Sequence, residues 1–199
     1  MSETDSQIAS AEKRHAGPGR PRNFDEAAAL DAAMQVFWQK GFEATSLDDL
    51  TKAMGLSRSS FYAAFGSKQT LFLRAVDHYS RRGLRSLKEV AETAEGDIVD
   101  AMLQALANPE GGSRGCLLIN CITELAPHDD QVADIGRRHL EAIEDMFAAA
   151  LNPENPEAAR DRASAFSSLA IGTLALRKAG IPAERIERTL QQARSVLPD

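Results

Sequence analysis

Short hydroxyl side chains beside a single cation mark residues 57–62 of the sequence. The segment RSSFYAAF is predicted to form a helix because Phe61, Ala64 and Phe65 fall on one face. Its other face carries Arg58, Ser59, Ser60 and Tyr62, and Ser57 precedes it as a cap. Hydroxyl and guanidinium groups donate to phosphates and base edges, and short side chains let a helix approach a surface closely. The pattern predicts a recognition helix for the major groove of DNA, whereas an ordinary solvated helix more usually carries Glu and Lys.

A second short helix is predicted immediately before this one. Ser46 is followed three residues later by Asp49, which is the spacing of a capping box. We therefore expect a helix from Leu47 to Met54, and Gly55 supplies the permissive backbone for its left-handed end. Two short helices joined by a tight turn form a helix-turn-helix motif, here over about residues 46–65.

The charge distribution favours a nucleic-acid partner in spite of the acidic total. The whole chain has a formal net charge of -6. Residues 13–88 hold 13 Lys and Arg against 7 Asp and Glu, a balance of +6, so the remainder carries -12. A basic N-terminal module joined to an acidic body is typical of a DNA reader with a separate regulatory domain.

Two arginines precede the predicted helices. Arg20 and Arg22 lie in GPGRPR, where glycine and proline oppose helix formation. Residues 1–22 are therefore expected to form a flexible basic arm. Such an arm can place arginine in a narrow minor groove, or can act as a tail that contacts phosphate without sequence preference.

The remaining sequence predicts an all-α fold. Helical patterns separated by Pro and Gly breaks cover residues 24–40, 68–91, 97–107, 115–126, 129–151, 156–179 and 183–197, and no strand pattern is present. We expect a DNA-binding domain at 23–83, with a three-helix helix-turn-helix core, and a helical ligand-binding and dimerisation domain at 84–199. The long helix from residue 68 is able to bridge the two.

The stretch FEATSLDDLTKAMGLSRSSFYAAFGSKQTLF resembles the DNA-binding region of the TetR/AcrR family of bacterial repressors. The elements at the family's spacing are Gly41-Phe42, Thr45, Gly55, Ser57, Phe61-Tyr62, Phe65 and Ser67-Lys68. The resemblance covers roughly Asn23 to Arg82, and the C-terminal half matches only in outline. It implies a homodimer that binds a palindromic DNA operator.

The DNA contacts are predicted from the residue types together with this resemblance. They are Arg20, Arg22, Thr45, Ser46, Ser57, Arg58, Ser59, Ser60, Tyr62 and Lys68. Lys68 lies in the first turn of a helix, where the helix dipole disfavours a cation. A phosphate bound there would account for it, as the resemblance also implies, and the alternative is a solvated lysine.

The apolar segment GCLLINCITEL predicts a buried helix with polar groups for a ligand, namely Cys116, Asn120, Cys121 and Thr123. The two cysteines diverge on a helix and are not expected to pair, and no metal-ligand spacing is present. The segment resembles that of regulators in which a cysteine early in this helix responds to electrophiles or oxidants. The helix N-terminus, with Arg114 alongside, favours the thiolate of Cys116. The alternative is that both cysteines are small core residues.

A dimer interface is predicted in the last two helices. Small residues allow close helix contact in 156–179, and an apolar stripe follows the final helix. The two helices are expected to form half of a four-helix bundle completed by a second subunit. The predicted contacts are Phe166, Leu169, Gly172, Leu176, Ile186, Leu190 and Ala193.

Together these observations predict a homodimeric transcriptional regulator, a repressor released by a small-molecule or electrophilic effector. Release would follow when the two recognition helices no longer match major grooves about 34–36 Å apart. No cofactor, metal or membrane partner is expected, and the lack of a signal-like or spanning segment predicts a cytoplasmic location. No catalytic motif supports an enzyme. An architectural or adaptor protein without effector control is the remaining alternative, and the sequence leaves effector, operator and sign of control open.

Overall fold

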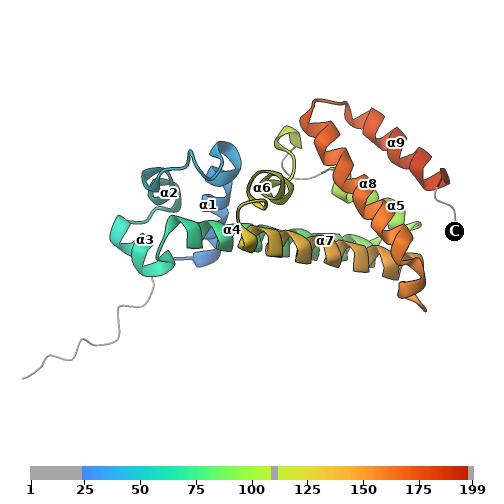
Figure 1. The fold of residues 1–199 in the computed structure, drawn as a ribbon, viewed down its shortest axis with the longest axis horizontal. Helices are drawn as coiled ribbons and strands as arrows, with labels where there is room; N and C mark the ends of the chain where they lie inside the picture. The colour runs from blue at the N-terminus through green and yellow to red at the C-terminus, as the bar shows by residue number, and fades with distance from the viewer. Residues whose placement is uncertain (1–23, 109–111, 197–199) are drawn as a thin grey trace, which may run out of the picture.

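Every regular element in residues 24–108 and 112–196, which the computed structural model describes, is a helix (Figure 1). The helices are α1 (Glu26–Lys40), α2 (Leu47–Met54), α3 (Arg58–Phe65), α4 (Lys68–Thr93), α5 (Ile98–Ala107), α6 (Leu117–Leu125), α7 (Asp130–Leu151), α8 (Arg160–Lys178) and α9 (Ala183–Val196). Short 3-10 turns at Gly112–Arg114 and Pro156–Ala159 precede α6 and α8. The predicted all-α class is confirmed. Arg20 and Arg22 of the predicted arm lie outside the described residues.

Side-chain caps place the starts of the N-terminal helices. Asp25, Ser46, Ser57 and Ser67 each accept a hydrogen bond from a backbone N–H in the first turn of the helix that follows. Such caps each contribute about 1 kcal/mol and satisfy N–H groups that the helix itself leaves unpaired. Because these signals are local, the predicted boundaries of α1 to α3 agree with the structure to within two residues.

The predicted helix at 156–179 is divided in the structure. Pro156 begins a 3-10 turn, and α8 starts only at Arg160. Neither the turn nor α8 has a side-chain cap hydrogen bond at its start. Without a cap, a tight initial turn is a common way to satisfy the first backbone groups.

An aromatic core holds the helix-turn-helix against α4. Phe37 of α1 meets Phe72 of α4 edge to face, with ring centroids 5.1 Å apart, and Phe42 lies 4.7 Å from the same ring. Phe61 and Phe65 bury the inner face of α3 in this cluster. The opposite face of α3 is thereby left on the surface.

The helix α4 takes part in two hydrophobic clusters. Its first half packs with α1, α2 and α3, and Leu87 in its second half packs with α5, α7, α8 and α9. At about 1.5 Å per residue, its 26 residues extend about 39 Å. Figure 1 shows α7 running alongside α4, so the two helices form a common base for the molecule. The boundary between residues 83 and 84 stays a prediction, because α6 packs with the first cluster.

The structure corrects part of the predicted dimer interface. Phe166, Ile186 and Leu190 have 0% exposed surface within the single chain, so they are core residues and have no surface left for a partner. The apolar stripe of α9 attaches that helix to the rest of its own chain, and a stripe alone does not tell which surface covers it. Leu176 is 40% exposed and Gly172 is exposed, whereas Leu169 and Ala193 are half-buried. An interface at these four positions stays a prediction.

Candidate nucleic-acid interface and ligand cavity

The outer face of α3 brings together the side chains predicted to contact DNA. Arg58, Ser59, Ser60 and Tyr62 are all exposed, and Ser57 lies at the start of the helix. The hydroxyl of Ser57 accepts from the Ser60 N–H at 3.1 Å and lies 2.9 Å from both neighbouring serine hydroxyls. Among the helices of the described residues, Figure 1 places α3 at one end, and no other described helix lies beyond it. The face is therefore open to a surface that approaches from that end.

The guanidinium of Arg58 is already paired within the chain. Its Nη2 and Nε donate to one oxygen of Asp48 in α2, at 2.7 and 3.2 Å. This hydrogen bond raises the pKa of the Arg58 guanidinium. Both side chains are well exposed, at 65% and 73%. Sequence reasoning missed Asp48, although an acid on the helix before the recognition helix was a visible signal.

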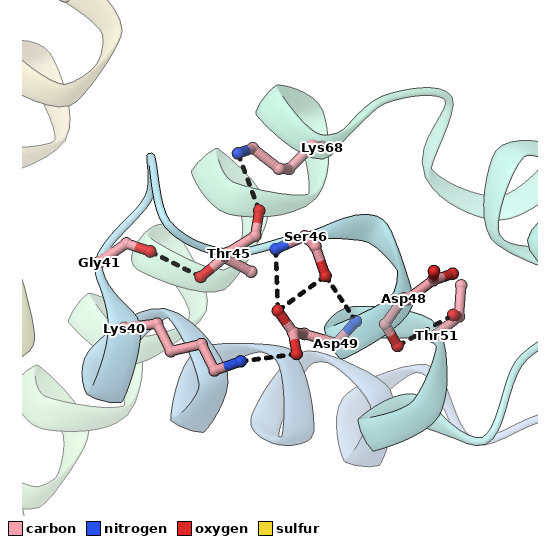
Figure 2. A network of polar contacts seen from close by, with 8 residues as sticks. All are labelled: Lys40, Gly41, Thr45, Ser46, Asp48, Asp49, Thr51 and Lys68. Carbon is pink, nitrogen blue, oxygen red and sulfur yellow. Dashed lines mark hydrogen bonds and ion pairs between the residues drawn. The ribbon is translucent and has the colours of Figure 1, made fainter.

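The predicted capping box at the start of α2 is confirmed (Figure 2). Ser46 accepts from the Asp49 N–H at 3.1 Å, and the Ser46 N–H donates to the Asp49 carboxylate at 3.0 Å. Lys40 at the end of α1 reaches the same carboxylate at 2.6 Å. Lys40, followed by Ser46, holds the pKa of the Asp49 carboxyl well below its usual range. The network ties the end of α1 to the start of α2 and leaves Ser46 at the surface.

Thr45 and Lys68 make contacts within the protein that the sequence did not predict (Figure 2). Thr45 is only 1% exposed, and its hydroxyl donates to the Gly41 carbonyl at 2.6 Å. The Lys68 ammonium donates to the carbonyls of Phe42 and Thr45, at 2.9 and 3.0 Å, with a longer 3.5 Å contact to Glu43. It also lies 4.4 Å from the centre of the Phe42 ring. The side chain of Thr45 is therefore turned into the protein, and Lys68 caps the α1–α2 loop. A phosphate contact at Lys68 stays a prediction.

A cavity of about 170 Å³ lies between α4, α5, α7 and α8, with the start of α6 at one side. Its walls are largely aliphatic, and its polar members include Tyr79, Arg82, Cys116 and His139. Of the residues predicted to sense a ligand, only Cys116 lines this cavity. Asn120 instead accepts from Lys178 and donates to the Arg114 carbonyl, and Thr123 bonds to carbonyls of its own helix.

The two cysteines occupy different environments. Cys116 is the N-cap residue of α6 without a side-chain cap bond, and the Tyr79 hydroxyl donates to its sulfur at 3.5 Å. Burial raises the pKa of Cys121 to about 12, so Cys121 stays a thiol at neutral pH. Arg114, expected beside Cys116, lies 4.4 Å over the Trp38 ring and donates to Gln35. The guanidinium therefore belongs to the contact with α1.

His139 and Arg82 add a neutral and a charged group to the cavity wall. Burial lowers the pKa of His139 to about 4, so its imidazole is neutral at physiological pH, and Ser80 lies 2.9 Å from its Nδ1. Arg82 donates to Asp31 of α1 at 3.0 Å. Neither residue was identified as a candidate site residue from the sequence. Their place in the cavity depends on packing between helices that are distant in the sequence.

An exposed polar recognition helix on a three-helix core, joined by one long helix to a helical bundle, defines a helix-turn-helix regulator. Residues 29–75 match the profile of bacterial regulatory proteins of the tetR family. The HTH-type transcriptional repressor BdcR of Escherichia coli (strain K12) is 30% identical over 181 residues, covering 88% of this chain and 90% of BdcR. The HTH-type regulator YezE of Bacillus subtilis (strain 168), which is uncharacterised, is 36% identical over 136 residues, 65% of this chain and 69% of YezE. The chain belongs to the TetR family of transcriptional regulators.

Solved structures share the whole fold. A cysteine mutant of the TetR family regulator CifR, complexed with 26 bp double-strand operator DNA, superposes with a TM-score of 0.73 at 28% identity, covering 88% of this chain and 97% of CifR. The reduced form of Escherichia coli NemR gives a TM-score of 0.71 at 19% identity, over 84% of this chain and 94% of NemR. In the described residues, no helix combines the length and apolarity that crossing a bilayer requires, and no cluster of potential metal ligands occurs.

Proposed function

We propose that this protein is a homodimeric repressor that inserts α3 into the major groove of a palindromic operator. The observation that carries the proposal is the division of α3 into a buried aromatic face and an exposed face of hydroxyls with one guanidinium. Arg58 and Tyr62 would contact bases, while Ser46, Ser57, Ser59 and Ser60 would donate to phosphates or base edges. CifR, a related protein of the same fold, has been solved on operator DNA.

The pairing of Arg58 with Asp48 is compatible with base recognition. Asp48 occupies the Nε–H and one Nη2–H of the guanidinium, and an arginine has five N–H donors. The Nη1 group and the second Nη2–H remain on the outer edge. That edge has the fork geometry that matches O6 and N7 of guanine. Asp48 would therefore hold Arg58 in place while the outer edge of the guanidinium donates to the base.

The effector site would be the cavity between α4, α5, α7 and α8. Its wall includes residues of α4, and the first half of the same helix packs against the helix-turn-helix. An effector that fits one orientation of α4 better than another would change the spacing of the two recognition helices in the dimer. Cys116 lines this cavity, so a reactive electrophile that enters it would meet a thiol. CifR has been solved as cysteine mutants and NemR in a reduced form, which makes thiol chemistry worth testing here.

The proposal is tested with Arg58→Ala in fluorescence anisotropy on an operator obtained by in vitro selection. Loss of a base contact is expected to weaken operator binding roughly 5- to 150-fold and to relax selectivity at one base pair. Arg85→Ala is the matched control, because Arg85 is an exposed arginine in the second half of α4. Circular dichroism should show the same helix content for both variants. If Arg58→Ala binds the operator as tightly as Arg85→Ala does, α3 is not the recognition helix.

A further inference from the structure

The wall of the cavity between α4, α5, α7 and α8 includes the guanidinium of Arg82, which also pairs with Asp31 in the DNA-binding part of the molecule. We propose that this cavity takes a small carboxylate with an apolar body of about the size of benzoate, whose carboxylate pairs with Arg82 in place of Asp31. The inference rests on the proposed function for its regulatory meaning. Ligand binding itself is a separate property of the cavity.

The size and lining of the cavity indicate the size and polarity of the apolar part of the ligand. Its volume is about 170 Å³. In another protein, an apolar cavity of about 150 Å³ accommodates benzene. Leucine and isoleucine side chains from five helices contribute to the wall, including Leu87, Ile143 and Leu174. A single six-membered ring, or an aliphatic chain of similar volume, therefore fits the apolar part.

The charge on the cavity wall indicates which polar group the ligand carries. Among the residues that line the cavity, Arg82 is the one permanently charged side chain, and neither Asp nor Glu is present. His139 is buried and neutral, and Tyr79, Ser86 and Asn108 are neutral polar groups. A cationic ligand would be repelled by Arg82, and a neutral ligand could not compete with Asp31 for its guanidinium. The planar guanidinium matches a carboxylate with two parallel hydrogen bonds.

The position of Arg82 makes the exchange of partners feasible. Its side chain is 32% exposed, so it lies where the cavity meets the surface, and Nη1 donates to Asp31 at 3.0 Å. Asp31 is 46% exposed and also lies 3.2 Å from Nε2 of His78. When Arg82 turns to a ligand, Asp31 keeps solvent and His78 as partners. No buried charge is left unpaired, which would otherwise oppose the exchange.

The exchange would connect ligand binding to DNA binding. Asp31 belongs to α1, and the end of α1 is tied to α2 through Lys40 and Asp49. Loss of the contact between Arg82 and Asp31 weakens the attachment of α1 to the middle of α4, where the contact between Asp31 and His78 remains. If the operator-bound form keeps this contact, carboxylate and operator compete, and each lowers the affinity for the other by the same factor.

The direct test is isothermal titration calorimetry on the full-length protein without DNA. Benzoate is compared with benzamide, benzyl alcohol and benzylamine, which have the same ring but a neutral or cationic head. Benzoate is expected to bind about tenfold or more tightly than benzamide, because a charge-assisted pair is stronger than a neutral hydrogen bond. Arg82→Gln should reduce benzoate to the affinity of benzamide. Arg85→Gln, on the same helix but outside the cavity lining, should leave benzoate binding unchanged.

A second measurement separates ligand binding from regulation. Benzoate should weaken operator binding in fluorescence anisotropy, and Asp31→Asn, which already lacks the ionic contact, should show a smaller response to benzoate. Equal affinities for benzoate and benzamide, no benzoate binding, or unchanged binding in Arg82→Gln would overturn the carboxylate site. A protein that binds benzoate as described but binds no selected DNA would instead overturn the proposed function.

Discussion

Replacing Leu190 by alanine is expected to destabilise the fold of the chain by about 3 kcal/mol. Leu190 belongs to α9 and is 0% exposed. It packs in a cluster with residues of α4, α5, α7 and α8. Truncation of a buried leucine to alanine costs about 2–5 kcal/mol, and the cost rises with the volume of the cavity left behind. Because α9 is the last helix and packs through one apolar face, some collapse around the site is expected. The estimate therefore lies in the lower half of that range.

The loss should be visible in thermal and chemical unfolding. For a chain of this size, 1 kcal/mol corresponds to a change in Tm of about 2–4 °C, so Leu190→Ala should lower Tm by about 6–12 °C. Urea unfolding followed by circular dichroism gives the free energy directly. Each curve should be recorded at several protein concentrations, because association stabilises the folded state by mass action.

Leu176→Ala is the matched control. Leu176 is on α8 and 40% exposed, so its truncation should change the free energy of unfolding of a protomer by less than about 0.5 kcal/mol. If Leu176 lies in the dimer interface, sedimentation velocity should show a weaker dimer for this variant. The assignment of Leu190 to the protomer core is refuted if Leu190→Ala keeps the wild-type urea midpoint and weakens only the dimer.

Two further predictions concern groups in and beside the cavity. The pKa of His139 is about 4 in the folded chain against 6.5 for the ordinary group, so the unfolded chain binds more protons between these values, and about 3 kcal/mol of stability should be lost as the pH falls from 6.5 to 4. The urea midpoint measured against pH checks this, and a profile as steep in His139→Gln as in the wild type would contradict it. Maleimide should modify Cys116 in the native protein and release the operator, whereas Cys121, with a pKa of about 12, should stay unlabelled. Mass spectrometry of the labelled protein distinguishes the two thiols, and undiminished release in Cys116→Ser would exclude that cysteine as the sensor.

Local signals made much of the fold predictable from sequence. The cap of Ser46, the left-handed Gly55 and the cap of Ser57 are encoded within a few residues, and the structure places the helix ends as expected. The division of α3 into inner and outer faces follows from the helical spacing of its apolar residues alone. These features need no knowledge of what the helix packs against.

Tertiary packing decided the features that the sequence did not predict. The sequence showed Lys68 at a helix start, but the carbonyls that bind its ammonium belong to a loop more than 20 residues away. The stripe of α9 was visible, whereas its burial on the same protomer was not. Arg82 and His139 enter the cavity only because α4 and α7 lie side by side. Functional residues gathered from several helices leave no spacing pattern in the sequence.

The exposed pair of Arg58 and Asp48 has a consequence for the search along the chromosome. A recognition helix with an unneutralised arginine attracts any stretch of duplex through its phosphates, and a repressor is then held on countless irrelevant sites. Here Asp48 cancels that charge within the protomer, and its own charge repels the backbone. Under the proposed function, such a regulator would dissociate readily from random sequence and would stay where a guanine at the correct position accepts from the outer edge of Arg58. The acid on α2 would then serve the speed of target location as well as the choice of target.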